Sequence, residues 1–278
     1  MKIRAIILSA LILCGISAVI MYSRAAQPLQ KSSVITQAIN DKNTPMVIKN
    51  LILKMKEQME VNDDQFPELI KEVENYTNSC ADSASVAVLH SMLAEMYQNY
   101  FQRNQWTINQ RTQLSGYIPE DIRVWTSNLF TDKIKEEIDL SLRPTALLQN
   151  TPVSKFKDIL EIGKDSQTLR PTLYEFLAFR ALDIQPTVQI YKDLIAFQNK
   201  EPNMKSVLLT ELDYLRFLYG DKRDKESFEA YMNALDELYR NLASQNYAAE
   251  ILIAKLDLVS GSMFRYASTN GILSKRKR

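Results

Sequence analysis

The sequence predicts an all-α protein of stacked antiparallel helical hairpins, with no sheet. Only 6 of its 278 residues are glycine, whereas the primed turns and bulges of β-sheets depend on glycine. Apolar residues recur at steps of three and four through most of the chain, which is the spacing of amphipathic helices. Most of the connecting segments are short, and a short connection places neighbouring helices antiparallel.

Residues 1–25 have the features of a Sec-type signal peptide. Lys2 and Arg4 make the start positive, and residues 5–21 contain no charged side chain. Small residues stand at both positions before a cut in the segment 23–25. The sequence therefore predicts export, to the periplasm or to the periplasmic face of a bacterial membrane.

An uncleaved membrane anchor is the alternative interpretation of residues 1–25. The apolar run lies at the lower edge of the roughly 17–25 residues that span a bilayer. Lipidation at Cys14 is disfavoured, because Leu13 stands where a bacterial lipobox has a small residue. No later stretch of the sequence is long and apolar enough to predict a second span.

The charge balance describes a mildly acidic folded body. The whole chain has 34 basic and 33 acidic residues, a net charge of +1. Lys2, Arg4 and Arg24 belong to the leader, so 31 basic and 33 acidic residues remain without it, a net charge of −2. Residues 275–278 hold four more positive charges, which leaves about −6 on the body. Nucleic-acid binding needs a basic face, so no nucleic-acid partner is expected.

The first half of the chain after the leader contains four segments with helical spacing. Thr44 is expected to cap the first, with Pro45 at the first helical position. Asp82 opens the third, and the segment 119–121 opens the fourth with carboxylates at the positive end of the helix dipole. The residues expected on the buried faces are Val47, Ile48, Leu51, Met55, Met59, Phe66, Leu69, Ile70, Val73, Val86, Leu89, Leu93, Met96, Tyr97, Tyr100, Ile122, Trp125, Leu129, Ile134 and Ile138.

The second half repeats this pattern. Pro171 is expected to start a helix, Pro186 to end it and start the next, and Gly220 to follow the helix 204–219 as its C′ residue. Two further helices complete the chain. The residues expected on the buried faces are Tyr174, Leu177, Ala178, Ala181, Ile190, Tyr191, Leu194, Phe197, Leu208, Leu212, Leu215, Leu218, Phe228, Tyr231, Leu235, Leu238, Leu242, Ile251, Leu252, Leu256 and Val259.

Two segments, residues 85–97 and 248–256, have the small and large residue spacing of a tetratricopeptide (TPR) helix. The chain does not keep the period of about 34 residues found in regular arrays of this kind. The predicted architecture is therefore a degenerate TPR-like solenoid. We expect one helical domain over residues 26–260, followed by a basic irregular tail over residues 261–278.

The sequence offers little material for catalysis. His90 is the only histidine, which excludes HExxH and paired-histidine metal sites. Cys80 is the only cysteine after the leader, so no intramolecular disulfide is expected, and we interpret it as a small residue near a helix junction. GxGxxG, P-loop, CxxC and GxSxG motifs are absent from the sequence. We predict no catalytic, cofactor-binding or metal residue and no cofactor; a hydrolase with two carboxylates stays as an alternative.

Five short segments together resemble a known family. They are residues 88–97, 104–106, 110–112, 121–130 and 173–183, in that order along the chain. These segments resemble the N-terminal helical region of the Bacteroidetes-type alpha-2-macroglobulin family, and the similarity runs from about residue 35 to 258. The motifs are structural rather than catalytic.

The resemblance implies an envelope protein on the periplasmic side, related to proteins that trap proteases. Such proteins carry β-sandwich macroglobulin domains and sometimes a Cys-x-Glu-Gln thioester. Neither residues 14–17 nor residues 80–83 form that motif, and the chain stops before such domains begin. We therefore expect a non-enzymatic helical module, from a split or truncated gene, that associates with a macroglobulin-like body. The alternative is a stand-alone TPR-like periplasmic adaptor that binds a peptide or protein partner.

Five aromatic residues lie in or near the segments that carry this resemblance: Trp106, Trp125, Tyr174, Phe176 and Phe179. Aromatic side chains at helical spacing usually pack between helices. They also suit the lining of a binding groove. Packing is the preferred interpretation, and the sequence names no binding site.

Overall fold

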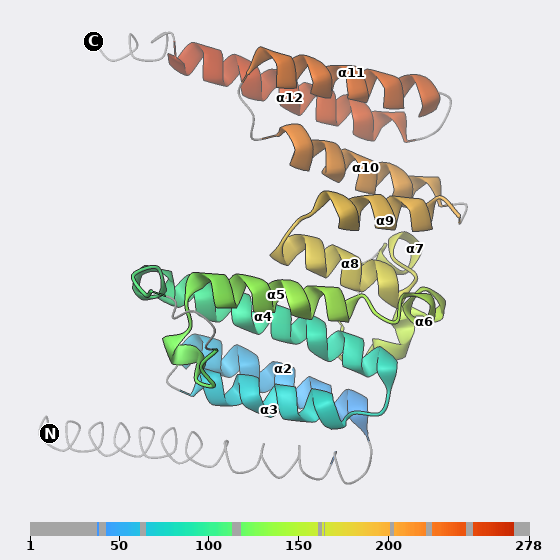
Figure 1. Cartoon of the computed structure of the whole chain (residues 1–278). Helices are drawn as coiled ribbons and strands as arrows, with labels where there is room; N and C mark the ends of the chain where they lie inside the picture. The colour runs from blue at the N-terminus through green and yellow to red at the C-terminus, as the bar shows by residue number, and fades with distance from the viewer. Residues whose placement is uncertain are drawn as a thin grey trace, which may run out of the picture. The chain divides into compact units, whose positions relative to one another are not determined.

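The computed structural model describes Ala38 and residues 43–269, apart from 62–64, 113–117, 161–162, 164, 201–202, 221–223 and 243–246. The part of the chain that it describes is all-helical and contains no β-strand (Figure 1). The predicted all-α class is therefore confirmed. No described helix is long and apolar enough to cross a membrane. The predicted leader, residues 1–25, lies outside the described residues.

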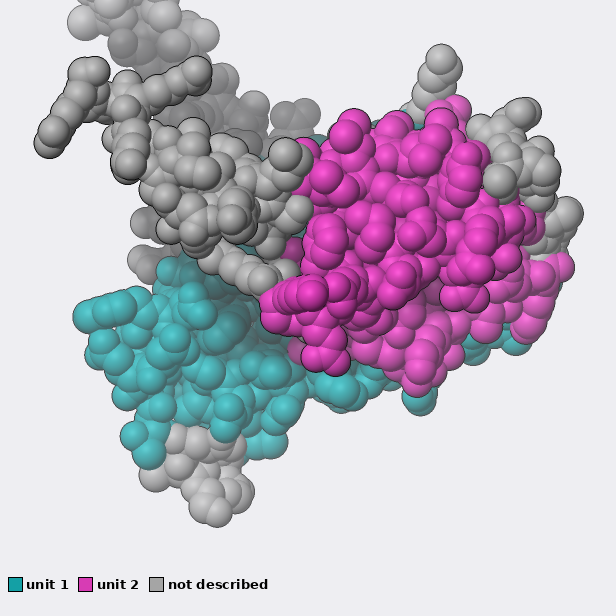
Figure 2. All heavy atoms as spheres, turned by 90° about the horizontal axis from the view of Figure 1, so that it is seen from above, with its two compact units in different colours: residues 1–163 teal, residues 164–278 magenta. Residues whose placement is uncertain are grey.

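The chain divides into two compact units, residues 1–163 and 164–278, coloured teal and magenta in Figure 2. The sequence predicts one helical domain over residues 26–260, whereas the boundary between the units falls after Gly163. Helical spacing is a property of single segments, so it does not reveal which helices share a core.

Unit 1 is built on one long helix. Its elements are α2 (Thr44–Val61), α3 (Phe66–Ser79), α4 (Ser83–Ile108), the 3₁₀ turn η1 (Ile122–Val124), α5 (Ser127–Ser141), α6 (Thr145–Asn150) and the 3₁₀ turn η2 (Val153–Phe156). Helices α2, α3 and α4 contact one another, and α5 lies along α4 (Figure 1). Helix α4 thus forms the centre of the unit.

Aromatic rings fill the space between α4 and α5. Phe130 is fully buried, and its ring lies 5.7 Å from those of Tyr100 and Phe101 and 5.3 Å from that of Trp125. Trp125 in turn stacks on Tyr97 at 5.7 Å. The sequence predicts Leu129 in this stripe, but the buried residue is Phe130.

That shift follows from where α5 begins. The predicted start at residues 119–121 was wrong, because Asp121 caps the short turn η1 through its contact with the Arg123 N–H. Trp125 then adopts an extended backbone, and α5 begins at Ser127. Ile122 and Trp125 therefore lie outside α5 and do not set its buried face. Phe130 lies one turn before the buried Ile134, so it points inward with Ile134 and Ile138 while Leu129 does not.

The helix starts follow capping chemistry. Asp82 caps α4 as predicted, its carboxylate accepting from the Ser85 N–H at 3.2 Å. The predicted cap Thr44 was wrong by one position, because Asn43 Oδ1 accepts from the Met46 N–H. Asparagine and threonine are both good N-cap residues, so the two positions competed in the sequence.

Unit 2 is a succession of helices, each in contact with the next from α8 onwards. It contains α7 (Ser166–Leu169), α8 (Leu173–Ile184), α9 (Val188–Gln198), α10 (Met204–Tyr219), α11 (Lys225–Leu242) and α12 (Ala248–Thr269). Helix α10 has its predicted bounds. Gly220 does not adopt the left-handed conformation of a C′ glycine; at φ −61° its N–H still donates to the Arg216 carbonyl at 2.7 Å.

The last three helices of unit 2 share a hydrophobic core. Its buried members are Leu208, Leu212, Tyr231, Leu235, Leu242 and Ile251. All six are among the residues predicted to be buried.

Helix α8 carries a complete capping box, in which Thr172 and Glu175 satisfy each other's backbone N–H groups.

Helix α12 differs from its prediction in two ways. Only Ile251 of the expected stripe is buried, while Leu252, Leu256 and Val259 face solvent. The helix has two apolar faces, and the face that contains Ile251 and Leu258 packs on the core. The helix also continues to Thr269, where an irregular tail was expected from residue 261. One helical glycine costs only about 1 kcal/mol, so Gly261 does not stop it; residues 270–278 lie outside the described residues.

Candidate functional site

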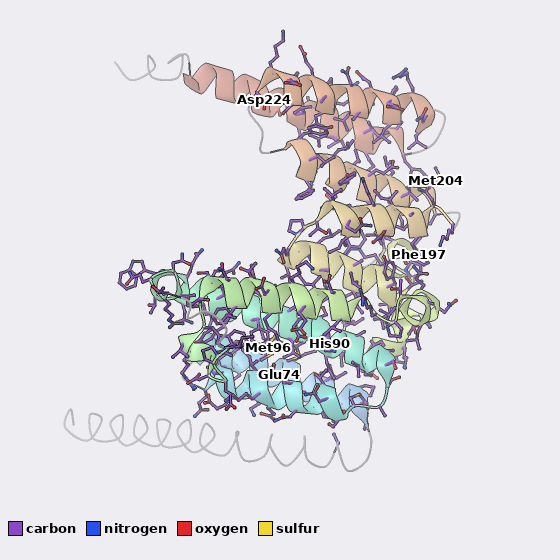
Figure 3. The ribbon with its side chains drawn as sticks, in the orientation of Figure 1. Glu74, His90, Met96, Phe197, Met204 and Asp224 are labelled. Atoms are coloured by element: carbon purple, nitrogen blue, oxygen red, sulfur yellow. The ribbon has the colours of Figure 1, made fainter. Side chains whose placement is uncertain are left out.

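The only histidine of the chain belongs to a polar network between α4 and α5. His90 Nδ1 donates to Glu137 Oε2 at 2.6 Å, and Lys133 Nζ lies 2.8 Å from Glu137 Oε1. The Glu137 side chain is only 3% exposed. Nearby, the Tyr97 hydroxyl donates to Glu74 Oε1 at 2.6 Å. Figure 3 labels His90 on α4 and Glu74 on α3.

Electrostatics keep Glu137 and Lys133 of this network charged. Burial alone raises the pKa of the Glu137 carboxyl, but hydrogen bonds from His90 and Lys133 outweigh burial and hold the pKa below its usual range. Burial alone lowers the pKa of the Lys133 ammonium, and its contacts with Glu137 and Glu136 raise it. Burial and the bond to Glu74 raise the pKa of the Tyr97 hydroxyl.

The network joins α4 to α5. Both oxygens of the buried Glu137 carboxylate already have partners, and one of them comes from the neighbouring helix. A general base needs a free oxygen within reach of a substrate proton. Among the residues that the structure describes, no group of three or more His, Cys, Asp or Glu side chains is arranged to hold a metal ion.

A groove of about 570 Å³ crosses α9, α10 and α11 in unit 2. These three helices follow one another in the stack shown in Figure 1. The floor is apolar and half-buried, formed by Ile195, Tyr214, Leu215 and Leu238. Exposed polar side chains surround it: Lys192, Asn199, Glu237 and Asn241. Ala196, Ala234 and the half-buried Glu211 complete the lining.

Packing beneath the groove holds its floor in place. Leu215 and Leu238 rest on the buried core shared by α10, α11 and α12. The Tyr214 ring lies 5.2 Å from that of Tyr191, which is buried on α9. A floor whose side chains are fixed by a core loses little entropy when a ligand binds.

The hollowed surface continues along α11. A second cavity of about 640 Å³ is lined by Ala230, Asn233, Ala234, Asp236, Glu237, Tyr239 and Arg240. Ala234 and Glu237 line both cavities. The small side chains of Ala230 and Ala234 leave room for a ligand beside the helix. Amide and charged side chains of the lining, such as Asn233, can supply hydrogen bonds.

The aromatic residues singled out in the sequence take different positions. Trp125 and Tyr174 are buried, which confirms packing for these two. Arg170 covers the Phe179 ring at 3.6 Å, and Arg180 lies 5.9 Å from the Phe176 ring. Trp106 is 78% exposed, so packing was wrong for it. None of the five is among the lining residues of the groove.

Cys80 lies at the junction between α3 and α4, as the sequence predicted, and its N–H donates to the Thr77 carbonyl.

The sequence did not predict the groove. Leu215 and Leu238 were expected to be buried in a core, and they do pack on one. A single sequence carries no signal that their other edge borders a groove with Tyr214, since that depends on the spacing of three helices.

No protein-family model, no curated protein and no solved structure matches this chain. The groove and the contacts around it are therefore the basis for a functional proposal.

Proposed function

We propose that this chain is a non-enzymatic helical module of the cell envelope that binds a peptide segment of a protein partner in the groove of unit 2. The observation that carries the proposal is the groove across α9, α10 and α11. It combines an apolar floor with exposed amides and charges at its edges. Such a lining suits an extended chain, because apolar side chains enter the floor while Asn199 and Asn241 bond the peptide backbone.

Two features favour binding over catalysis. Both carboxylate oxygens of the buried Glu137 are already bonded within the protein, to His90 on α4 and to Lys133 on α5. The groove lining also lacks histidine, cysteine, serine and threonine, so its described walls do not suit a hydrolase that depends on one of these side chains. These observations support the proposal that the chain is not an enzyme.

A degenerate TPR-like solenoid is the proposed architecture behind this function. Consecutive helices from α8 to α12 contact one another, as they do in helical repeat proteins that bind peptides on their surface. The proposed export depends on residues 1–25 alone. The proposal that a macroglobulin-like body is the partner depends on the resemblance of sequence segments such as 88–97 and 173–183.

Peptide selection tests the groove directly. The purified protein is used to select from a phage-displayed library of random 12-residue peptides, and the enriched peptides are synthesised and titrated by fluorescence polarisation. We expect enriched sequences with large apolar residues and micromolar affinity. Ala196→Glu places a long charged side chain in the groove and should weaken binding at least tenfold.

Ala146→Glu is the matched control. It introduces the same side chain at another exposed helical alanine, on α6 in unit 1, and does not line the groove. Binding should be unchanged in this variant. The proposal fails if no peptide is enriched, or if both variants bind as the unsubstituted protein does.

Co-purification distinguishes the two proposed contexts. The tagged protein is isolated from native membranes and periplasm, and its stoichiometric partners are identified by mass spectrometry. A macroglobulin-type partner favours the macroglobulin-like assembly. A different partner that is lost in Ala196→Glu favours the stand-alone adaptor.

A further inference from the structure

Glu211 is the one groove residue whose charge is both partly buried and uncompensated in the described contacts. It lies near the middle of α10 and borders the apolar floor. Among the hydrogen bonds and ion pairs of the described residues, none involves Glu211. Burial raises the pKa of its carboxyl.

Within the part of the chain that the structure describes, Glu211 has no ion-pair partner. Lys192 on α9 and Glu237 on α11 are the other charged residues of the lining, and both are exposed. Lys192 forms no ion pair with Glu211 within the part of the chain that the structure describes. The described lining therefore has one positive and two negative charges, with the less exposed negative charge next to Tyr214 and Leu215 on the same helix.

We infer that Glu211 selects a lysine or arginine side chain in the bound peptide, next to a large apolar residue that occupies the floor. This inference rests on the proposed peptide-binding function. A carboxylate held at an apolar surface loses part of its hydration, so a ligand cation that bonds to it recovers that loss. The aliphatic stem of lysine or arginine lies well on apolar side chains while its charged end reaches the carboxylate.

The test is a double-mutant cycle between protein and peptide. One selected peptide is synthesised with its basic residue intact and with that residue replaced by glutamine. Both peptides are titrated against the unsubstituted protein and against Glu211→Gln. With the unsubstituted protein, loss of the basic residue should weaken binding about tenfold. With Glu211→Gln, the two peptides should bind equally.

Glu237→Gln is the control variant, because it removes an exposed carboxylate of the same groove. It should keep most of the tenfold difference between the peptides. Glutamine matches glutamate in size, and it removes an uncompensated charge, so Glu211→Gln should fold at least as stably; circular dichroism checks this.

Acid provides a second measurement. Because burial raises the pKa of Glu211, the carboxyl loses its charge at a higher pH than an exposed glutamate. As the pH falls from 7, the basic peptide should lose more affinity for the unsubstituted protein than for Glu211→Gln, which retains only the exposed carboxylate of Glu237 in the lining. Lys192, Glu237 and Tyr214 are the other titratable groups in the lining, and all three are retained in this variant.

The outcomes separate the inference from the function. If peptides bind, Ala196→Glu blocks them and glutamine replaces the basic residue without loss, the groove binds peptides and the role of Glu211 is overturned. If no peptide binds at all, both the proposed function and the inference are overturned. Tenfold coupling that disappears in Glu211→Gln establishes the inference.

Discussion

At the scale of single residues, Glu137 is the best place to test how unit 1 is held together. Glu137→Leu should lower the free energy of unfolding by about 3–5 kcal/mol, because it leaves His90 and Lys133 without their shared buried acceptor. Glu136 contacts the same Lys133 ammonium at 2.9 Å but is 58% exposed. Glu136→Gln should therefore cost less than about 1 kcal/mol. Urea unfolding compares the two, and equal losses would contradict the assigned role of Glu137.

The same carboxylate predicts an acid dependence. The folded state holds the pKa of Glu137 below its ordinary value, so its contribution is complete above the pKa of the unfolded chain, about 4.3. That contribution is lost as the pH falls through the lower folded-state pKa. Glu137→Gln should show a shallower loss of stability between about pH 5 and pH 2 in urea titrations. A slope identical to that of the unsubstituted protein would contradict this.

At the scale of elements, the start of α8 depends on its capping box. Thr172→Ala should cost about 1 kcal/mol, because it removes the acceptor for the Glu175 N–H and the hydroxyl donor to the Glu175 carboxylate. Thr172→Ser keeps both hydrogen bonds and should restore most of the loss. Thermal unfolding followed by circular dichroism measures the difference. Serine and alanine variants of equal stability would show that the hydroxyl does not stabilise the helix.

Two apolar residues of α12 that look alike in the sequence should respond differently to substitution. Ile251 is fully buried, so Ile251→Ala should destabilise unit 2 by about 2–5 kcal/mol. Leu256 is 66% exposed, so Leu256→Gln should change stability by less than about 0.5 kcal/mol. Urea unfolding of both variants tests the assignment of faces. A large loss in Leu256→Gln would mean that this face is covered in solution.

At the scale of the whole molecule, each compact unit has a core of its own. Leu235 is fully buried in the core of unit 2, and Leu235→Ala should destabilise that unit by about 2–5 kcal/mol. Hydrogen exchange measured by mass spectrometry should then accelerate in α10, α11 and α12 and stay unchanged in α3, α4 and α5. Phe130→Leu should produce the reverse pattern. Loss of protection in both units from either change would show that they unfold as one.

Local features of the sequence determined the fold class and most of the helices. Scarce glycine and apolar steps of three and four predicted an all-helical chain, and prolines and caps such as Asp82 placed helix starts within a few residues. These signals act over one or two turns, so they can be read without knowing the neighbours. They succeeded where one helix face was apolar, as on α10.

Tertiary structure decided everything that depends on which helices meet. Helix α12 is apolar on two faces, and only its contact with α10 and α11 selects the face of Ile251. Glu137 looked like any charged helix residue until α5 brought it against His90. The groove is lined by side chains from three consecutive helices, with Tyr214 and Glu211 half-buried in its lining. Burial and pairing are relations between segments, so periodicity within one segment does not contain them.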